Sequence, residues 1–347
     1  MTASRAVRLA AEQHNPCEDR DVRFVVYGAG AIGGVLGGRL AEHGSDVVLV
    51  ARGPHLEAIR SKGLTIESPD ATVTVDVEAV GQPADARIGE GDVVVLAMKS
   101  QDTVTALEAL AACAPADTPV VCAQNGVDNE RSALRRFKNV YSMCVMCPAS
   151  HLDPGVVQAS SSPVTGLMDL GRWPAGRDAV ADGIAGTLSG ATYSSVSRDD
   201  IARWKWGKLL MNLGNAVEAS FQPDEAARQL AELARREGQQ CLEAAGIDAV
   251  GAEEDAARRG ALLTARPIGE RPRGGGSTWQ SLARSAGVVE TDYLTGEIVL
   301  LGRLFGVATP VNERLQQLAN ELARSHEPPA SRSADAMLEV LAPGRGT

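Results

Sequence analysis

A glycine-rich turn near the start of the chain constrains the fold more than any other feature. An apolar, strand-like segment, 22–27, leads directly into it, and a segment with helical apolar periodicity follows to about 43. The turn reads, in order, Gly28, Ala29, Gly30, Ala31, Ile32 and Gly33. In this context the first glycine permits a tight turn, the second lets the backbone approach a pyrophosphate, and the third lets the helix pack on the strand. Because a helix N-terminus also favours phosphate, the sequence predicts a dinucleotide-binding turn rather than a glycine turn without a ligand.

The residue after the second predicted strand, 46–51, indicates which dinucleotide is bound. An acidic residue about 20 positions beyond the glycine turn would hold the ribose 2′-hydroxyl of NAD. This chain has Arg52 there, and Asp46 lies at the opposite end of the strand. A guanidinium group suits a 2′-phosphate, so NADPH/NADP+ is the predicted cofactor. The alternative is that Arg52 is an ordinary surface arginine.

The pattern along the chain predicts two domains and two flexible ends. Strands and helices alternate from 22 to 195, which is typical of an α/β, doubly wound parallel sheet of the Rossmann type. From 196 to 326 the apolar residues recur at helical spacing, and we expect an all-helical domain. Its helices are predicted at 199–219, 224–245, 252–265, 277–286, 290–305 and 310–325. Residues 1–21 are predicted to be a flexible arm and 327–347 a flexible tail.

Composition excludes several classes of function. Lys and Arg number 34 against 44 Asp and Glu, a formal net charge of -10, which argues against a nucleic-acid partner. No apolar run approaches the roughly 18 residues of a membrane-spanning helix, so a cytoplasmic protein without a membrane partner is expected. The histidines have no ligand spacing and no metal site is predicted. Cys144 and Cys147 form a C-x-x-C within a predicted strand, where the two thiols would point to opposite faces.

Polar residues follow two later strands of the predicted sheet. Lys99 and Gln101 come after the strand at 92–98, and Asn125 follows the strand at 119–123. Ligands of open α/β sheets bind beyond the carboxyl ends of the strands. These three side chains are therefore candidates for lining the nicotinamide end of the cofactor site, although each is also compatible with a simple turn.

One helix of the second domain carries a polar stripe. Lys208, Asn212 and Asn215 share one face of the apolar segment 204–215. Reduction of a carbonyl places negative charge on oxygen, and a lysine can supply both a proton and a hydrogen bond there. The alternative is a lysine that extends to solvent. Ser277 and Glu290, further along, could be a helix cap and a favourable N-terminal charge.

Taken together, these segments resemble the ketopantoate reductase (2-dehydropantoate 2-reductase) family. The matching motifs are collinear over about 22–322: GAGAIGG at 28–34, VVLVARG at 47–53, DVVVLAMKSQDT at 92–103, AQNGVDNE at 123–130, KWGKLLMNLGNAVEA at 205–219, STWQSLAR at 277–284 and ETDYLTGEIVLLGRLFGVATPVNERL at 290–315. The resemblance implies NADPH-dependent reduction of a 2-oxo acid, most directly 2-dehydropantoate to (R)-pantoate in pantothenate and coenzyme A biosynthesis.

The resemblance also assigns roles to residues. It implies that Lys208 is the proton donor, that Asn212 binds the substrate hydroxyl or carbonyl, and that Ser277 binds the substrate carboxylate. It also implies that Glu290 contacts the cofactor or orients the lysine. The family's second helix asparagine falls on Ala216 here, with Asn215 one residue earlier, and two further family asparagines have no clear counterpart. The substrate is therefore left open between 2-dehydropantoate and another 2-oxo or 3-oxo acid, and a non-catalytic NADP-binding regulator is the alternative from a different class. A homodimer is left open.

Overall fold

The computed structural model describes residues 22–151, 153–269 and 274–341. Its largest element is an eight-stranded sheet with the order β13-β12-β8-β7-β6-β1-β2-β5. In that order the strands are Tyr193–Ser194, Gly166–Arg172, Val140–Met146, Val120–Cys122, Val93–Leu96, Phe24–Tyr27, Val47–Val50 and Glu78–Val80. Neighbouring strands are parallel except β12, which runs antiparallel to β8. No helix separates β8 from β12, and a parallel return requires a crossover connection, which explains this exception to the predicted parallel sheet.

Helices cover both faces of this sheet, as a doubly wound fold requires. They are α1 (Ala31–Glu42), α2 (Gly53–Lys62), α3 (Thr103–Ala111), α4 (Asn129–Leu134) and α5 (Ala179–Gly190), with 3-10 turns at Pro83–Ala86 and Ser100–Asp102. Side chains of β1 alternate between two cores: Phe24 and Val26 pack in the core that includes α1 and α5, and Val25 packs in the core that includes α3. The predicted Rossmann-type domain is confirmed.

Two small sheets flank the main one. The first has the order β4-β3-β10-β9, formed by Thr72–Val75, Leu64–Glu67, Val156–Ala159 and Ala149–Ser150. The second pairs β11 (Ser161–Pro163) with β14 (Leu263–Ala265). The helix predicted over 252–265 is therefore wrong in its second half: it ends at Arg259, because Gly260 has a φ of 46° and the chain beyond it pairs as a strand.

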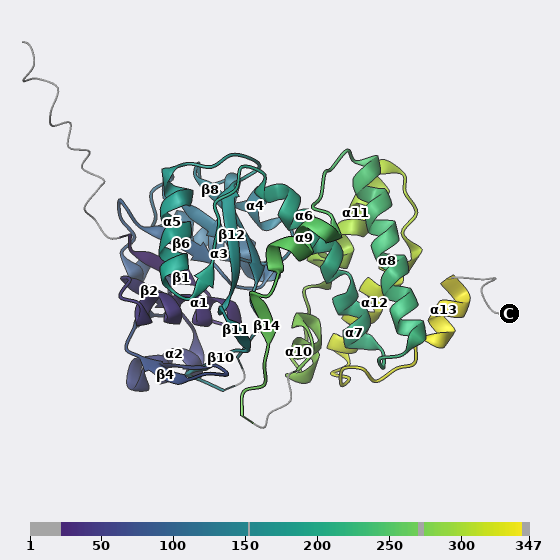
Figure 1. Cartoon of the computed structure of the whole chain (residues 1–347), viewed down its shortest axis with the longest axis horizontal. Coiled ribbons are helices and arrows are strands. Elements are labelled where there is room, and N and C mark those ends of the chain that lie inside the picture. The colour runs from purple at the N-terminus through teal and green to yellow at the C-terminus, as the bar shows by residue number, and fades with distance from the viewer. Residues whose placement is uncertain (1–21, 152, 270–273, 342–347) are drawn as a thin grey trace, which may run out of the picture.

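The remaining helices form a second lobe, at the right of Figure 1. They are α6 (Ile201–Asn212), α7 (Gly214–Ser220), α8 (Glu225–Ala244), α9 (Ala252–Arg259), α10 (Ser277–Ala283), α11 (Thr295–Phe305), α12 (Pro310–Arg324) and α13 (Asp335–Leu341), with a 3-10 turn at Thr291–Tyr293. The helix expected over 199–219 is divided at Leu213, whose φ of -61° and ψ of -28° stay helical. The helix expected from 290 begins at Thr295, after the turn.

The segment from 327 was predicted to be flexible, and the structure corrects this as far as 341. Backbone N–H groups of Gln222 and Arg332 bond to Arg332 O (2.9 Å) and Ser220 O (3.2 Å). Apolar residues of α13, among them Met337 and Leu338, pack against the helical core at the edge of Figure 1. Backbone pairing with a distant segment and the short apolar face of α13 order these residues, although their composition is rich in Pro, Ala and Ser. Residues 1–21 and 342–347 lie outside the described residues.

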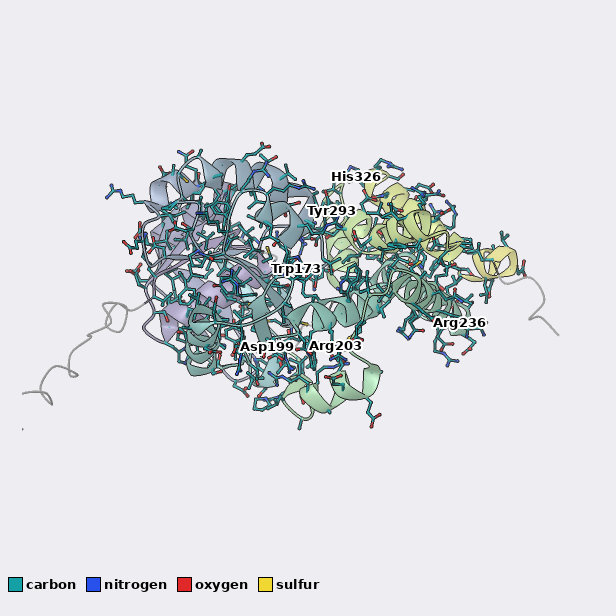
Figure 2. The ribbon with its side chains drawn as sticks, turned by 90° about the horizontal axis from the view of Figure 1, so that it is seen from above. Trp173, Asp199, Arg203, Arg236, Tyr293 and His326 are labelled. Atoms are coloured by element: carbon teal, nitrogen blue, oxygen red, sulfur yellow. The ribbon has the colours of Figure 1, made fainter. Side chains whose placement is uncertain are left out.

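The two lobes meet at α6 and at Trp173. Trp173 lies at the junction in Figure 2 and packs against a core cluster of each lobe. Helix α6 packs on β8 of the main sheet. Among the residues that the structure describes, no helix has the length and apolar character to cross a membrane. The junction is therefore the place where residues of both lobes come together.

Candidate functional site

A cleft of about 1280 Å³ lies between the two lobes. Residues from both lobes line it, including the carboxyl ends of β1 and β6 and one face of α6. The predicted site residues that line the cleft are Gly28, Ala29, Gly30, Ala31, Ile32, Arg52, Lys99, Asn125, Lys208, Asn212, Asn215, Ser277 and Glu290. The two domains predicted from the sequence thus bring almost all of the predicted residues to one cavity.

Two predicted cofactor residues lie outside this lining. Gly33 lies behind the turn: a Cβ there would be 2.1 Å from Gly28 O and 2.9 Å from Ala97 Cβ, which fits the predicted role in helix–strand packing. Gln101 lies in the 3-10 turn after β6, where its Oε1 is buried without a hydrogen-bond partner in the described part of the chain. Sequence position placed Gln101 at the correct strand end, but the turn directs its side chain away from the cleft wall.

The glycine turn fits a dinucleotide pyrophosphate. Gly28 has a φ of 104°, and a Cβ there would meet Met98 N at 2.6 Å, so only glycine suits this position. Gly30 precedes α1 and lines the cleft, and a Cβ built on it has nothing within 4 Å. Open space in front of the N-terminus of a 12-residue helix is what a phosphate group requires.

A pair of histidines supports this turn, and the sequence analysis assigned no role to either of them. The Gly155 N–H donates to His55 Nδ1 (2.9 Å), so His55 Nε2 carries the proton and donates to Ala29 O (2.7 Å). His151 packs on His55 with a ring-centroid distance of 4.1 Å. Burial lowers the pKa of His151 to about 4, aided by His55 and Arg284. Both rings line the cleft and are neutral at physiological pH.

Arg52 lies at the end of β2 with its side chain 84% exposed. Its nearest ionic partner is Asp102, at 3.6 Å between Nη2 and Oδ2. An exposed pair at this distance is weak and leaves the guanidinium accessible from the cleft. The geometry is compatible with a 2′-phosphate ligand.

Lys99 and Glu290 lie on opposite lobes and meet at the cleft. The Ser100 N–H donates to Glu290 Oε1 (2.9 Å), and Lys99 Nζ donates to Ser281 Oγ (3.0 Å). Burial raises the pKa of Glu290, opposed by the Ser100 hydrogen bond and the Lys99 charge. Burial also lowers the pKa of Lys99. These contacts tie the turn after β6 to α10 and to the segment before α11.

Lys208, on α6, begins a chain of hydrogen bonds that crosses the cleft to the sheet domain. Its Nζ donates to Asn212 Oδ1 (2.9 Å), and Asn212 Nδ2 donates to Asn125 Oδ1 (3.4 Å). Because the amide of Asn212 is oriented by both partners, its oxygen faces the lysine. Burial lowers the pKa of Lys208, and the positive charge of Lys205 acts in the same direction. A lysine of lowered pKa beside a neutral amide is suited to proton donation.

Lys205, one helical turn before Lys208, forms a buried ion pair that the sequence analysis missed. Its Nζ lies 3.0 Å from Glu130 Oε1, and the two side chains are 3% and 0% exposed. The same Nζ donates to Gln124 O (2.6 Å), and Ser142 Oγ donates to Glu130 (2.6 Å). The pair fixes α6 to the sheet domain. The available signal was a second lysine in this apolar segment, one helical turn before the polar stripe that begins at Lys208.

Both C-x-x-C cysteines lie close to the cleft: Cys147 lines it, and Cys144 acts electrostatically on Lys208. Cys144, in β8, and Cys147, just after it, are free. Burial raises the pKa of the first thiol to about 11 and of the second to about 12, so neither is a thiolate at neutral pH. They form polar contacts with two different carbonyl oxygens, those of Trp204 and Thr165.

Comparisons with known proteins identify the family of this chain. Residues 24–174 match the family described as "Ketopantoate reductase PanE/ApbA", and residues 200–323 match its C-terminal domain. The chain is 30% identical over 305 residues to the 2-dehydropantoate 2-reductase of Archaeoglobus fulgidus, covering 85% of this chain and 96% of that protein. The match to the Pyrococcus horikoshii protein of the same name is 31% identical over 55% of this chain, but spans only 61% of that protein.

Solved structures show the same fold. A ketopantoate reductase of this family from Ralstonia eutropha superposes with a TM-score of 0.74 at 25% identity, over 88% of this chain and 100% of that chain. D-mandelate dehydrogenase, solved with NADH and anilino(oxo)acetate, gives 0.71 at 20% identity, over 88% of this chain and 99% of that one. The latter likeness concerns the fold alone. With both family domains matched in order and a full-length relative at 30% identity, the chain belongs to the ketopantoate reductase family.

Proposed function

We propose that this protein reduces a small 2-oxo acid with NADPH, and that 2-dehydropantoate, giving (R)-pantoate, is the first substrate to test. The observation that carries the proposal is the shared cleft: the glycine turn of one lobe and Lys208 of the other line a single cavity. Relatives named 2-dehydropantoate 2-reductase support the substrate. A pantothenate role, a cytoplasmic location and a homodimer stay predictions.

The residues of the chain divide the work by position. When bound, a reduced nicotinamide supplies the hydride for the carbonyl carbon. Lys208 donates a proton from Nζ to the carbonyl oxygen as negative charge develops there. Asn212 holds Lys208 in place through the 2.9 Å hydrogen bond, and Asn125 orients Asn212 from the sheet domain. Asn215 and Ser277, on the same cleft wall, are proposed to bind the substrate.

NADPH is proposed over NADH because of the charge at the end of β2. Arg52 offers an accessible cation there. A 2′-phosphate matches a guanidinium, whereas a free 2′-hydroxyl is best matched by a carboxylate. Lys99, Asn125 and Glu290 are proposed to contact the nicotinamide ribose end, since they lie at the carboxyl ends of β6 and β7 or face them.

The test is a turnover assay that follows loss of the near-ultraviolet absorbance of NADPH. 2-Dehydropantoate is compared with a panel of other 2-oxo and 3-oxo acids, and NADPH with NADH. We expect the highest kcat/KM with NADPH and a 2-oxo acid, and loss of turnover in Lys208→Ala with NADPH affinity retained. Tight NADPH binding without turnover of any keto acid would favour the regulator alternative.

One observation favours a different acid as a second candidate. The position eight residues after Lys208 is Ala216, which is buried, whereas the family places a polar amide there. Asn215 lines the cleft instead. A higher kcat/KM for another 2-oxo acid than for 2-dehydropantoate would support this second candidate.

A further inference from the structure

Two arginines of the cleft, Arg259 and Arg284, have no role in the function proposed above. Arg284 lies on the cofactor side. Its Nη1 donates to His151 O (3.4 Å), and His151 packs on His55, which bonds to Ala29 in the glycine turn. Arg284 also acts electrostatically on Lys99. Arg259 is in a different environment and requires a separate explanation.

Arg259 lies beside the proton-donating lysine. It is the last residue of α9, and its Nη2 lies 4.0 Å from the Met211 sulfur. Met211 follows Lys208 by three residues and so lies next to it on the surface of α6. Arg259, Asp255 and Lys205 are among the charged groups that act on Lys208, and the titratable thiol of Cys144 in β8 also acts on it.

Ion pairs hold α9 against β12 and α6, and they fix the position of Arg259 at the end of that helix. Arg258 forms two hydrogen bonds to Asp169 in β12, Nε to Oδ2 at 2.8 Å and Nη2 to Oδ1 at 2.6 Å, and Asp169 is 3% exposed. Arg203, labelled on α6 in Figure 2, pairs with Glu254 at 3.1 Å. Bidentate Arg–carboxylate pairs fix geometry as well as charge.

Arg259 retains hydrogen-bonding capacity and charge for a ligand. It pairs with Asp255 through Nη2, while its Nη1 forms no hydrogen bond among the residues described and the side chain is 35% exposed. Lys208 and Arg259 carry two positive charges and Asp255 carries one negative charge. One positive charge is left over at this end of the cleft, which matches a single carboxylate.

We propose that Arg259 binds the carboxylate of the substrate while Lys208 contacts its carbonyl oxygen, and that the apolar chain of the substrate lies against Met211 and Leu263. The substrate class is then a monocarboxylic 2-oxo acid, whose carboxylate and carbonyl are adjacent and are met by one cation each. Met211 and Leu263 line the same cleft and are partly exposed. The proposal rests on the proposed reductase function and adds a cationic ligand for the carboxylate, which the family resemblance assigns to the Ser277 hydroxyl alone.

The test compares each 2-oxo acid with its methyl ester, which keeps the carbonyl and lacks the charge. In the wild type the acid is the better substrate. Arg259→Gln should lower kcat/KM for the acid by about 10- to 100-fold, the effect of removing a hydrogen bond to a charged group, and leave the ester unchanged. Arg259→Lys should restore part of the preference as a simple point charge.

Controls separate binding from folding. Arg259→Gln leaves Asp255 buried without its cation, so the double variant Asp255→Asn/Arg259→Gln is measured beside it. NADPH affinity by fluorescence should be unchanged in all of them, and Arg303→Gln, an arginine 71% exposed on α11, is the matched control. An unchanged acid-to-ester ratio in both Arg259 variants overturns the proposal. No wild-type turnover of any 2-oxo acid would instead refute the proposed function itself.

Discussion

Replacing Lys205 with methionine should destabilise the fold by about 3–5 kcal/mol, the cost of leaving one buried charge without its partner. Methionine keeps the length and most of the volume of the lysine chain. It leaves the fully buried Glu130 carboxylate with Ser142 at 2.6 Å as its one remaining hydrogen-bond partner in the described chain, because its Oε2 has none. The lost ion pair is one that holds α6, the helix that also carries Lys208.

Neutralising the partner, Glu130, should lower the free energy of unfolding by less than Lys205→Met does, because the buried ammonium keeps other acceptors. In Glu130→Gln the ammonium of Lys205 keeps two carbonyl acceptors, Gln124 O at 2.6 Å and Met143 O at 3.4 Å. The glutamine amide can still accept from Ser142. The double variant Lys205→Met/Glu130→Gln removes both charges and should recover most of the Lys205→Met loss, as buried pairs replaced by neutral groups do.

Urea unfolding followed by circular dichroism measures these differences from the midpoint and slope. The control is Glu108→Gln, which breaks the surface pair with Arg136 (3.2 Å, Glu108 61% exposed) and should cost less than about 1 kcal/mol. A Lys205→Met loss no larger than that of the control, or a double variant whose loss equals the sum of the two singles, would refute the reasoning.

Further predictions concern the cleft. Because burial lowers the pKa of Lys208, and a proton donor works only when protonated, kcat/KM should fall with rising pH at a lower pH than an exposed lysine would give. Lys205→Met should move this fall to higher pH by removing a neighbouring positive charge. Arg52→Asp should shift preference from NADPH toward NADH, by about 10-fold or more in the ratio of kcat/KM values, and an unchanged ratio would exclude a 2′-phosphate contact. Gly30→Val should abolish NADPH binding in a fluorescence titration, because its side chain would fill the open space proposed for the pyrophosphate, and should leave the unfolding midpoint nearly unchanged. Gly28→Ala should lower that midpoint, because its Cβ would lie 2.6 Å from Met98 N at a φ of 104°.

The features that could be predicted from the sequence are local ones. The glycine turn, the apolar strands and the stripe formed by Lys208, Asn212 and Asn215 each depend on spacing within a short segment. The structure brings these groups to one cleft because the carboxyl ends of parallel strands lie at the same edge of the sheet. The three polar residues of α6 share one face of the helix, and that face lines the same cleft.

The features that could not be predicted depend on partners distant in the sequence. Strand β14 pairs with β11 through Ser161 and Ala265, and the segment after 327 pairs at Arg332 with Phe221. Neither segment has the alternation of apolar and polar residues by which a strand can be predicted from sequence. Arg259 was missed for the same reason: an arginine at the end of a predicted helix shows no sign of the methionine and lysine that it will face on α6.

The two lysines of α6 show how the surroundings decide what a side chain does. Lys208 follows Lys205 by three positions; Lys205 is fully buried, whereas Lys208 is half-buried and lines the cleft. A carboxylate faces Lys205, so its ammonium is engaged in a structural pair that joins the lobes. A neutral amide faces Lys208, so the Asn212 hydrogen bond directs Nζ but supplies no opposite charge, and desolvation lowers the pKa of Lys208. Proton transfer from Lys208 to a substrate therefore breaks no ion pair, whereas the ammonium of Lys205 is the partner of the buried Glu130 carboxylate. The same residue type therefore serves as an anchor at 205 and is suited to donate a proton at 208, and the anchor sets the position from which the donor reaches the cleft.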